Sequence, residues 1–183
     1  DDSPGSLGTS LWPLYQKHPH SDGNPGADTS MPILLVKTLH ILGAMLFFGT
    51  GLGSAWYKFR SFQSQSLSVM AWCDKEIVFA DWVFTVPSGI IMPVTGLYLV
   101  QAYGMPLQTH WVMVGLVGYC IAGIFWLPAA YLQILMKRLS QKALETGTAL
   151  DPAYARYQKI WMLLGFPSFL AAITVIGAMV CKF

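Results

Sequence analysis

The hydrophobic positions of this chain form four long apolar runs, each continuous rather than alternating with polar residues. The runs cover about residues 31–57, 77–102, 109–136 and 160–181. Roughly 20 apolar residues in helical form match the thickness of a bilayer's hydrocarbon core. Since only helices and closed barrels satisfy the backbone in lipid, and barrel strands alternate, the runs are predicted to be helices. The pattern predicts an all-α membrane protein, an antiparallel four-transmembrane-helix bundle in residues 31–183.

The boundaries of the runs follow from turn and charge signals. Residues 82–136 contain no Asp, Glu, Lys or Arg, and the sequence YGMP at 103–106 divides this stretch into two spans. After the third span we expect a helical extension that stops at Gly147, and a further helix that starts at Asp151-Pro152. Prolines inside the spans are expected to kink them and to open space between helices, namely Pro87, Pro93, Pro128 and Pro167.

Residues 1–30 differ from the rest, because they are rich in Gly, Pro, Ser and Asp and show no helical or strand period. They contain no apolar core of a signal peptide. We interpret them as a polar, flexible N-terminal extension. The pair His18 and His20 within it is interpreted as incidental rather than as a metal site.

Composition agrees with a membrane protein and excludes some functions. Hydrophobic residues make up 54% of the chain and charged residues 11%, whereas soluble domains have about 25% charged residues. A net charge of +2 gives no reason to expect nucleic acid as a partner. The three cysteines, Cys73, Cys120 and Cys181, lack the spacing of a zinc site or a disulfide framework and are read as small apolar fillers.

The cations predict the orientation in the membrane. Segment 58–76 holds Lys58, Arg60 and Lys75, segment 137–159 holds five more cations, and the 103–110 turn holds none. The positive-inside rule makes the two cation-rich loops cytoplasmic. Both termini are therefore expected to face outward from a bacterial cytoplasmic (inner) membrane.

His40 is the leading candidate for chemistry, because an ionisable side chain inside a span is costly and suggests function. Small or aromatic residues share its side of the helix: Gly43, Ala44, Phe47 and Gly51. A neutral imidazole suits an axial position on haem iron. The alternative is a histidine that hydrogen-bonds across helices. His110, at the start of the third span, is the nearest second histidine by topology, and Met92 or Met45 is the other candidate for a sixth ligand.

Two charged residues accompany this candidate. Lys37, one turn before His40, either reaches the outer interface or pairs with an anionic group such as a haem propionate. Asp81 opens the second span. We expect it to cap that helix, to pair with Lys58, Arg60 or Lys75, or to handle protons in catalysis.

Aromatic and amide side chains lie at about the depth of Asp81. They form either an aromatic belt at the interface or a polar-aromatic pocket at the cytoplasmic mouth of the bundle. The residues are Trp82, Trp126, Tyr131, Gln133 and Trp161. The nearby glycines of Gly49-Thr-Gly-Leu-Gly53 follow no strand and lie inside a span, so they indicate close helix packing rather than a nucleotide site.

Four segments resemble, in order, a bacterial family of predicted integral membrane proteins, domain-of-unknown-function family 2269. The resemblance covers about residue 31 to the C-terminus, and its most specific blocks are A-D-W-x-F-T-x-P at 80–87 and W-L-P-x-x-x-x-Q at 126–133. The segments are KTLHILGAMLFFGTGLGSAWYKFR, ADWVFTVPSGIIMPVTGLYLV, GYCIAGIFWLPAAYLQILMKRL and YQKIWMLLGFPSFLAAITVIGAMV. The family name implies no activity.

The K-x-x-H at Lys37–His40 is also similar to the opening of the four-helix haem-type protoporphyrinogen oxidases. That similarity implies haem b ligated by His40, with Lys37 beside it. We therefore expect a haem b-binding membrane protein in redox or electron-transfer chemistry, either a quinone-linked oxidase or an accessory redox subunit.

Two alternatives remain open. One is a non-catalytic structural or assembly subunit of a larger membrane complex, or a homodimer formed through small-residue faces. The other is a small transporter or channel, which the few polar residues of spans three and four and the lack of an inverted repeat disfavour.

Overall fold

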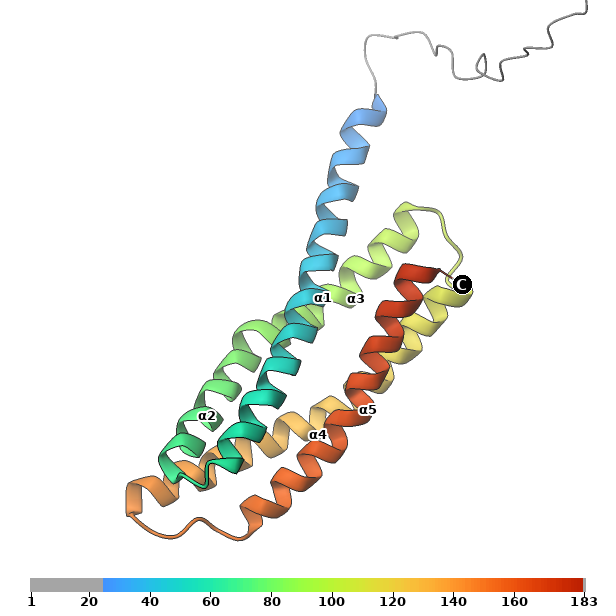
Figure 1. Ribbon diagram of the computed structural model, residues 1–183. Helices are drawn as coiled ribbons and strands as arrows, with labels where there is room; N and C mark the ends of the chain where they lie inside the picture. The colour runs from blue at the N-terminus through green and yellow to red at the C-terminus, as the bar shows by residue number, and fades with distance from the viewer. Residues whose placement is uncertain (1–24, 183) are drawn as a thin grey trace, which may run out of the picture.

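The structure is a computed structural model that describes residues 25–182, with side chains from Ser30 onward (Figure 1). It is helical throughout, with α1 (Pro25–Gln63), α2 (Leu67–Ala80), a π-helical segment η2 (Asp81–Thr85), α3 (Val86–Ala102), α4 (His110–Thr146) and α5 (Ala153–Cys181). Because α2, η2 and α3 follow one another without a break, the described chain has four helices long and apolar enough to cross a membrane. The predicted all-helical membrane fold is confirmed to this extent.

The helices extend beyond the apolar runs. α1 begins at Pro25 rather than near Met31, and the expected loop 58–76 is helical except for the turn at 64–66. Polar residues in this region, such as Lys58 and Asp74, are buried between helices, so they continue the helices instead of ending them. The extension expected at 1–30 lies outside the described residues up to residue 24, and with it His18 and His20.

The ends of α4 and α5 follow the local signals closely. Gly147 ends α4 in the left-handed conformation, with φ of 65°, which glycine adopts without steric cost. The Asp151 carboxylate accepts a hydrogen bond of 2.8 Å from the backbone N–H of Ala153, the first residue of α5. Pro152 is thus the N-cap residue of α5 rather than its first helical residue.

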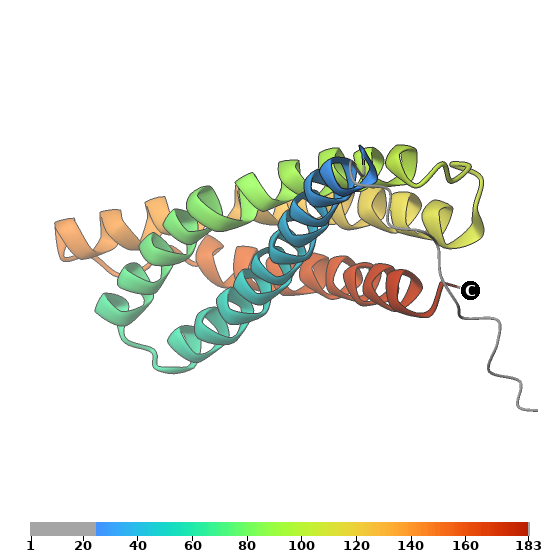
Figure 2. The ribbon, with the colours of Figure 1, turned by 90° about the horizontal axis from the view of Figure 1, so that it is seen from above.

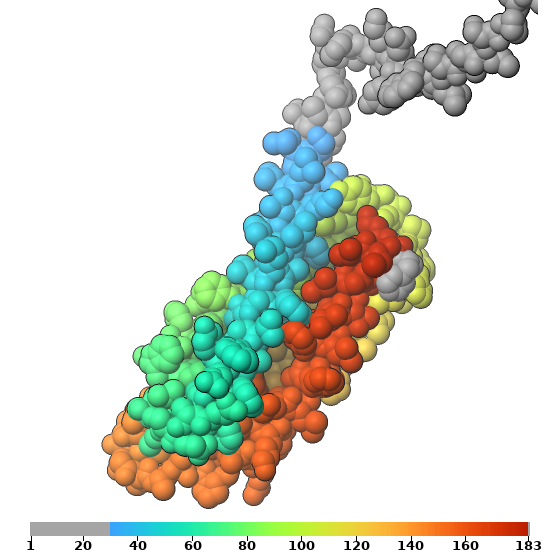
Figure 3. Space-filling model, viewed as in Figure 1, coloured from blue at the N-terminus to red at the C-terminus, as the bar shows by residue number. Residues whose placement is uncertain are grey.

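The helices pack in a definite order. α4 and α5 lie along each other, α1 packs against α3 and α2, and α2 packs against α4 (Figures 1 and 2). The 64–66 turn and the 147–152 loop lie at one end of the molecule, and the 103–109 loop and the C-terminus lie at the other. The N-terminal part of α1 projects beyond the remaining helices (Figure 3).

Glycines allow α4 and α5 to approach closely. A Cβ atom at Gly115 would lie 2.5 Å from Cε of Met179, and one at Gly118 would lie 2.5 Å from Cγ2 of Val175. Small residues commonly permit such contacts between membrane helices. The glycines Gly49, Gly51 and Gly53 of α1 have no such neighbour within 4 Å, so the close packing expected there is not found.

The π-helical segment η2 lies in the middle of the second membrane-crossing helix. It precedes Pro87, whose ring would clash with the carbonyl of Val83 in a regular α-helix. Widening the turn to π geometry relieves that clash without breaking the helix. Pro93, Pro128 and Pro167 lie inside α3, α4 and α5, and the kinks expected at them stay a prediction.

The buried hydrophobic core lies toward the end that carries the 64–66 turn. Met70 of α2, Ala129 and Met136 of α4, and Tyr154 and Trp161 of α5 form one contiguous cluster. The outer faces of the helices are apolar as well, which suits contact with lipid. Two polar groups of side chains lie within this same part of the bundle.

Candidate functional site

A buried ion pair and its hydrogen-bond partners join α1, α2, α4 and α5 at one end of the bundle. Lys58 of α1 pairs with Oδ1 of Asp74 on α2 and donates to the Tyr154 hydroxyl of α5 over 3.0 Å. Ser140 of α4 donates to Oδ2 of Asp74 over 2.7 Å, and the Tyr154 hydroxyl lies 3.0 Å from the same oxygen. Each carboxylate oxygen therefore has a donor, as a charge in a low-dielectric interior requires.

Sequence reasoning missed this cluster. It placed Lys58 in a cytoplasmic loop and did not single out Asp74. The available signal was the position of the two residues, since each lies about two helical turns from the short 64–66 turn and would face the other across a helical hairpin. We define the cluster of Lys58, Asp74, Ser140 and Tyr154 as the ion-pair cluster.

A second buried cluster surrounds Asp81 at the start of η2. Thr85 donates to Oδ1 of Asp81 over 2.8 Å. With the Gln133 amide oriented to satisfy its neighbours, its nitrogen donates to Oδ2 of Asp81 over 2.7 Å and its oxygen accepts from Trp161 Nε1 over 3.3 Å. We call Asp81, Thr85, Gln133 and Trp161 the Asp81 cluster.

These contacts correct the expectations for Asp81. It neither caps a helix N-terminus nor pairs with Lys58, Arg60 or Lys75, because α2 begins at Leu67, about four turns earlier, and Asp74 takes Lys58. Its two oxygens accept only neutral donors among the described residues.

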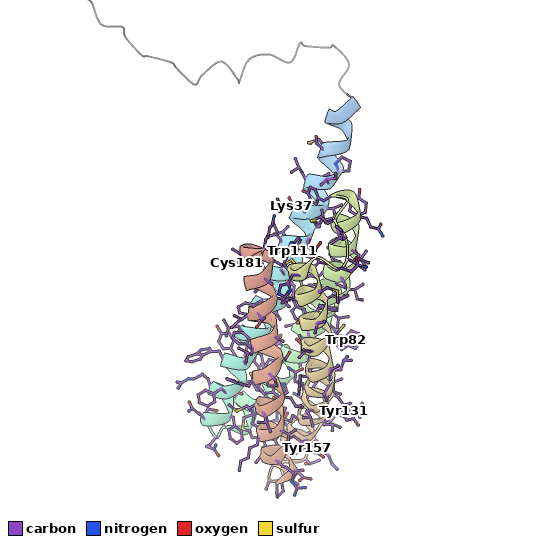
Figure 4. All side chains as sticks on the ribbon, turned by 90° about the vertical axis from the view of Figure 1, so that its right-hand side faces the viewer. Lys37, Trp82, Trp111, Tyr131, Tyr157 and Cys181 are labelled. Atoms are coloured by element: carbon purple, nitrogen blue, oxygen red, sulfur yellow. The ribbon has the colours of Figure 1, made fainter. Side chains whose placement is uncertain are left out.

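The aromatic residues expected at this depth separate into two groups. Trp161 is buried in the Asp81 cluster, and the Trp126 ring is tilted against Phe47 of α1 at 6.4 Å between centroids. Trp82 and Tyr131 point away from the bundle (Figure 4), with 63% and 61% of their surface exposed. An inner polar-aromatic site and an outer aromatic surface therefore exist together.

His40 faces the neighbouring helix α3 and is half-buried. Its Nδ1 lies 3.1 Å from the carbonyl oxygen of Met92 and 3.0 Å from Oγ1 of Thr95. The Thr95 hydroxyl donates to the carbonyl of Ile91 over 2.6 Å, so both neighbours of Nδ1 act as acceptors. This arrangement assigns the ring proton to Nδ1, and a neutral imidazole then carries its lone pair on Nε2.

The residues expected around His40 are only partly gathered there. Gly43 is buried against the Met92 side chain, and Gly96 of α3 leaves the room that the imidazole ring occupies. Lys37, one turn earlier, is exposed (Figure 4), and Gly51 is exposed as well.

The other candidate ligands lie elsewhere. His110 is the first residue of α4 and lines an apolar groove of about 490 Å³ with α5 residues such as Pro167 and Thr174. Met45 is 65% exposed on the outside of α1, and the Met92 side chain packs on Gly43. His40 and His110 therefore face different helices.

A bare metal ion and a haem iron require different numbers of protein ligands. Within residues 25–182 no group of three or more His, Cys, Asp or Glu side chains could hold a metal ion. A haem needs only one protein nitrogen, and hydrogen bonding of Nδ1 to a carbonyl is the usual arrangement of a metal-binding histidine. Among the described residues, His40 offers a haem iron one axial ligand, and neither His110 nor Met45 lies beside it as a second.

Comparisons with known proteins give a family but no activity. No curated protein and no solved structure matches the chain. A family model described as a predicted integral membrane protein, DUF2269, matches residues 34–183, which include both polar clusters and His40. The chain therefore belongs to the DUF2269 family of predicted integral membrane proteins.

Proposed function

We propose that this protein binds haem b at His40 and serves redox or electron-transfer chemistry in the membrane, as a quinone-linked oxidase or an accessory redox subunit. The observation that carries the proposal is the position of His40 Nδ1 between two acceptors, the Met92 carbonyl and the Thr95 hydroxyl. These contacts fix the ring and favour Nε2 as the ligating nitrogen. A bound haem would supply one-electron chemistry there.

The chain's own residues have separate parts in this proposal. His40 holds the group, Met92 and Thr95 orient the imidazole, and Gly96 leaves space for it. Lys37 lies one turn along α1 and is exposed, so its ammonium is free to approach a propionate. Asp81, on η2, is a separate proton-handling group, whereas His40 contacts α3.

We also propose that the four helices form an antiparallel bundle across a cytoplasmic membrane with both termini outward. The support is the distribution of charge. With Lys58 neutralised by Asp74, exposed cations still gather near the 64–66 turn and the 147–152 loop, namely Arg60, Lys75, Arg138, Lys142, Arg156 and Lys159. The positive-inside rule makes that end cytoplasmic.

The absorption spectrum of the protein purified in detergent tests the haem proposal. We expect a Soret band in the wild type, its loss in His40→Ala, and a retained band in the matched variant His110→Ala, because His110 faces α5. Thr95→Val should keep the band but shift its position. A wild type without a Soret band after growth with a haem precursor, or a His40→Ala band equal to that of wild type, contradicts the proposal.

A non-catalytic subunit of a larger membrane complex is the second candidate, and the projecting part of α1 favours it. Large apolar residues there are exposed, namely Met31, Leu34, Leu35 and Leu39. Extraction in mild detergent tests this candidate, since a subunit would co-purify in a complex of defined mass, whereas a particle of one chain speaks against it.

A further inference from the structure

The two polar clusters lie two helical turns apart in the interior of the bundle, and the buried side chain of Met136 also lies at the level between them. Asp74 and Asp81 are seven residues apart on the second membrane-crossing helix, and Ser140 and Gln133 are seven apart on α4. Seven residues are two helical turns, so each pair lies on one face and is separated by about 10 Å along the helix. That distance is too long for a direct hydrogen bond between the clusters.

Gln158 of α5 occupies the level between them. It follows Tyr154 of the ion-pair cluster by four residues and precedes Trp161 of the Asp81 cluster by three, so the three share a face. Gln158 is 1% exposed, and neither its amide nitrogen nor its amide oxygen has a hydrogen-bond partner among the described residues. A buried amide without hydrogen-bond partners is destabilising, and proteins usually satisfy such groups with internal water.

The ion-pair cluster is reached from one end of the molecule. A groove of about 390 Å³ lies between the 64–66 turn and the 147–152 loop, and Tyr154 forms part of its wall together with polar residues such as Gln65, Thr148 and Asp151. Beyond the Asp81 cluster the buried positions of α4 are apolar, namely Ala129, Ala122, Gly118, Gly115 and Val112. Buried polar side chains therefore run from the groove to the Asp81 cluster, and the next one along the second membrane-crossing helix, Ser88, has its hydroxyl bound to the Phe84 carbonyl.

We propose that Gln158 holds internal water between the two clusters and that this water carries protons between the groove and Asp81. The Gln158 amide offers the water one donor and one acceptor, while the ion-pair cluster and the Asp81 cluster provide partners on either side. A water that receives a proton from the groove side releases another toward Asp81, whose carboxylate becomes the neutral acid. When the solution at the groove becomes more alkaline, the proton leaves by the same path, and no electron is transferred.

The groups that face this path come from every helix packed against it. Lys58 of α1 and Asp74 of α2 are its charged members, and they neutralise each other, while the buried Cys73 thiol of α2 is a further titratable group beside them. α4 contributes the neutral Gln133 and Ser140, and α5 contributes Tyr154, Gln158 and Trp161. The path does not require haem, because His40 belongs to the contact between α1 and α3.

Infrared difference spectroscopy of the full chain in lipid nanodiscs tests the proposal. In the wild type we expect an acid carbonyl band that responds to bulk pH, shifts after transfer to D₂O and is absent from Asp81→Asn. Gln158→Leu should slow the deuterium shift about tenfold or more, because an apolar side chain leaves the water without partners. Gln141→Leu is the control, since the Gln141 amide already donates to the Ala71 carbonyl over 2.8 Å.

Deuterium exchange in Gln158→Leu at the wild-type rate would overturn the proposal. If Gln158→Leu does not fold, the wild type still decides, because an Asp81 carbonyl band that stays unshifted in D₂O contradicts a hydrated path. Neither result depends on a Soret band, so failure of this proposal is distinguishable from failure of the haem proposal.

Discussion

Lys58 and Asp74, sixteen residues apart, form an ion pair between α1 and α2 with side-chain exposures of 1% and 0%. Removing one partner leaves the other charge buried without a counter-ion. We expect Lys58→Met or Asp74→Asn to lower the free energy of unfolding by about 3–5 kcal/mol, measured by chemical unfolding in detergent. Arg60→Met, which changes an exposed cation on the same helix, should have little effect.

The double variant of Lys58 and Asp74 separates pairing from simple loss of side chains. Lys58→Met combined with Asp74→Asn should cost less than the sum of the single changes, because neither charge is then left alone. Strict additivity would show that the two groups do not stabilise each other.

The Tyr154 hydroxyl serves the ion pair, while its ring packs on Phe62 at 6.3 Å between centroids. Tyr154→Phe keeps the ring and removes the hydroxyl from both Lys58 and Asp74. We expect a loss of about 1–3 kcal/mol in the free energy of unfolding. The same change at the more exposed Tyr157 is the control, and equal losses in the two variants would rule out a special role for the Tyr154 hydroxyl.

Gly118 sets the contact between α4 and α5. A side chain there meets Val175, whereas Gly123 on the same helix has no neighbour of this kind within 4 Å. Gly118→Leu should therefore lower the free energy of unfolding by about 1–3 kcal/mol, which is measured as a lower thermal unfolding temperature in detergent. Gly123→Leu should leave the unfolding temperature unchanged. Equal unfolding temperatures for the two variants would contradict a close contact between α4 and α5 at Gly118.

Gly96 controls the room beside His40. A Cβ atom at Gly96 would lie 3.1 Å from Cε1 of His40, while Gly49 on α1 has no such neighbour. Gly96→Ala should shift the ring ¹⁵N resonances of His40, assigned with His40→Gln, and Gly49→Ala should leave them in place. Unchanged resonances in Gly96→Ala would place the ring away from α3.

The proposed sidedness predicts which loops a membrane-impermeant thiol reagent reaches in intact cells. In a variant with Cys73, Cys120 and Cys181 replaced by alanine, Leu107→Cys should react from outside. Gln65→Cys and Thr148→Cys should react only after the membrane is opened. Labelling of Gln65→Cys in intact cells would reverse the orientation.

Hydropathy was sufficient for the helices but not for their inner contacts. Long apolar runs predict four helices, and Gly147 predicts where α4 stops, because both are local properties of the chain. The partner of Lys58 could not be predicted in this way, since Asp74 is chosen by packing across a turn. Lys75, the next residue, is charged as well and is exposed, so charge alone does not tell which of the two residues is buried.

The same difference explains the outcome at the candidate site. Gln133 and Trp161 were expected near Asp81 from their depth alone, and the structure brings both into contact with it or with each other. Depth does not specify direction around a helix, so Trp82 and Tyr131 were grouped with them although they point outward. The π-helical turn at 81–85 was not predicted, because Pro87 indicates a distortion of the helix but does not specify that one turn widens.

That π-helical turn means that one extra residue is accommodated inside a continuous rod. Deleting a single residue between Asp81 and Thr85 would leave the apolar length almost unchanged, yet it would rotate α3 relative to α2 by about 100°. Asp74 could stay beside Lys58, or Thr95 could stay beside His40, but not both. The extra residue in this turn thus allows Asp74 to face Lys58 and Thr95 to face His40 from the same membrane-crossing helix.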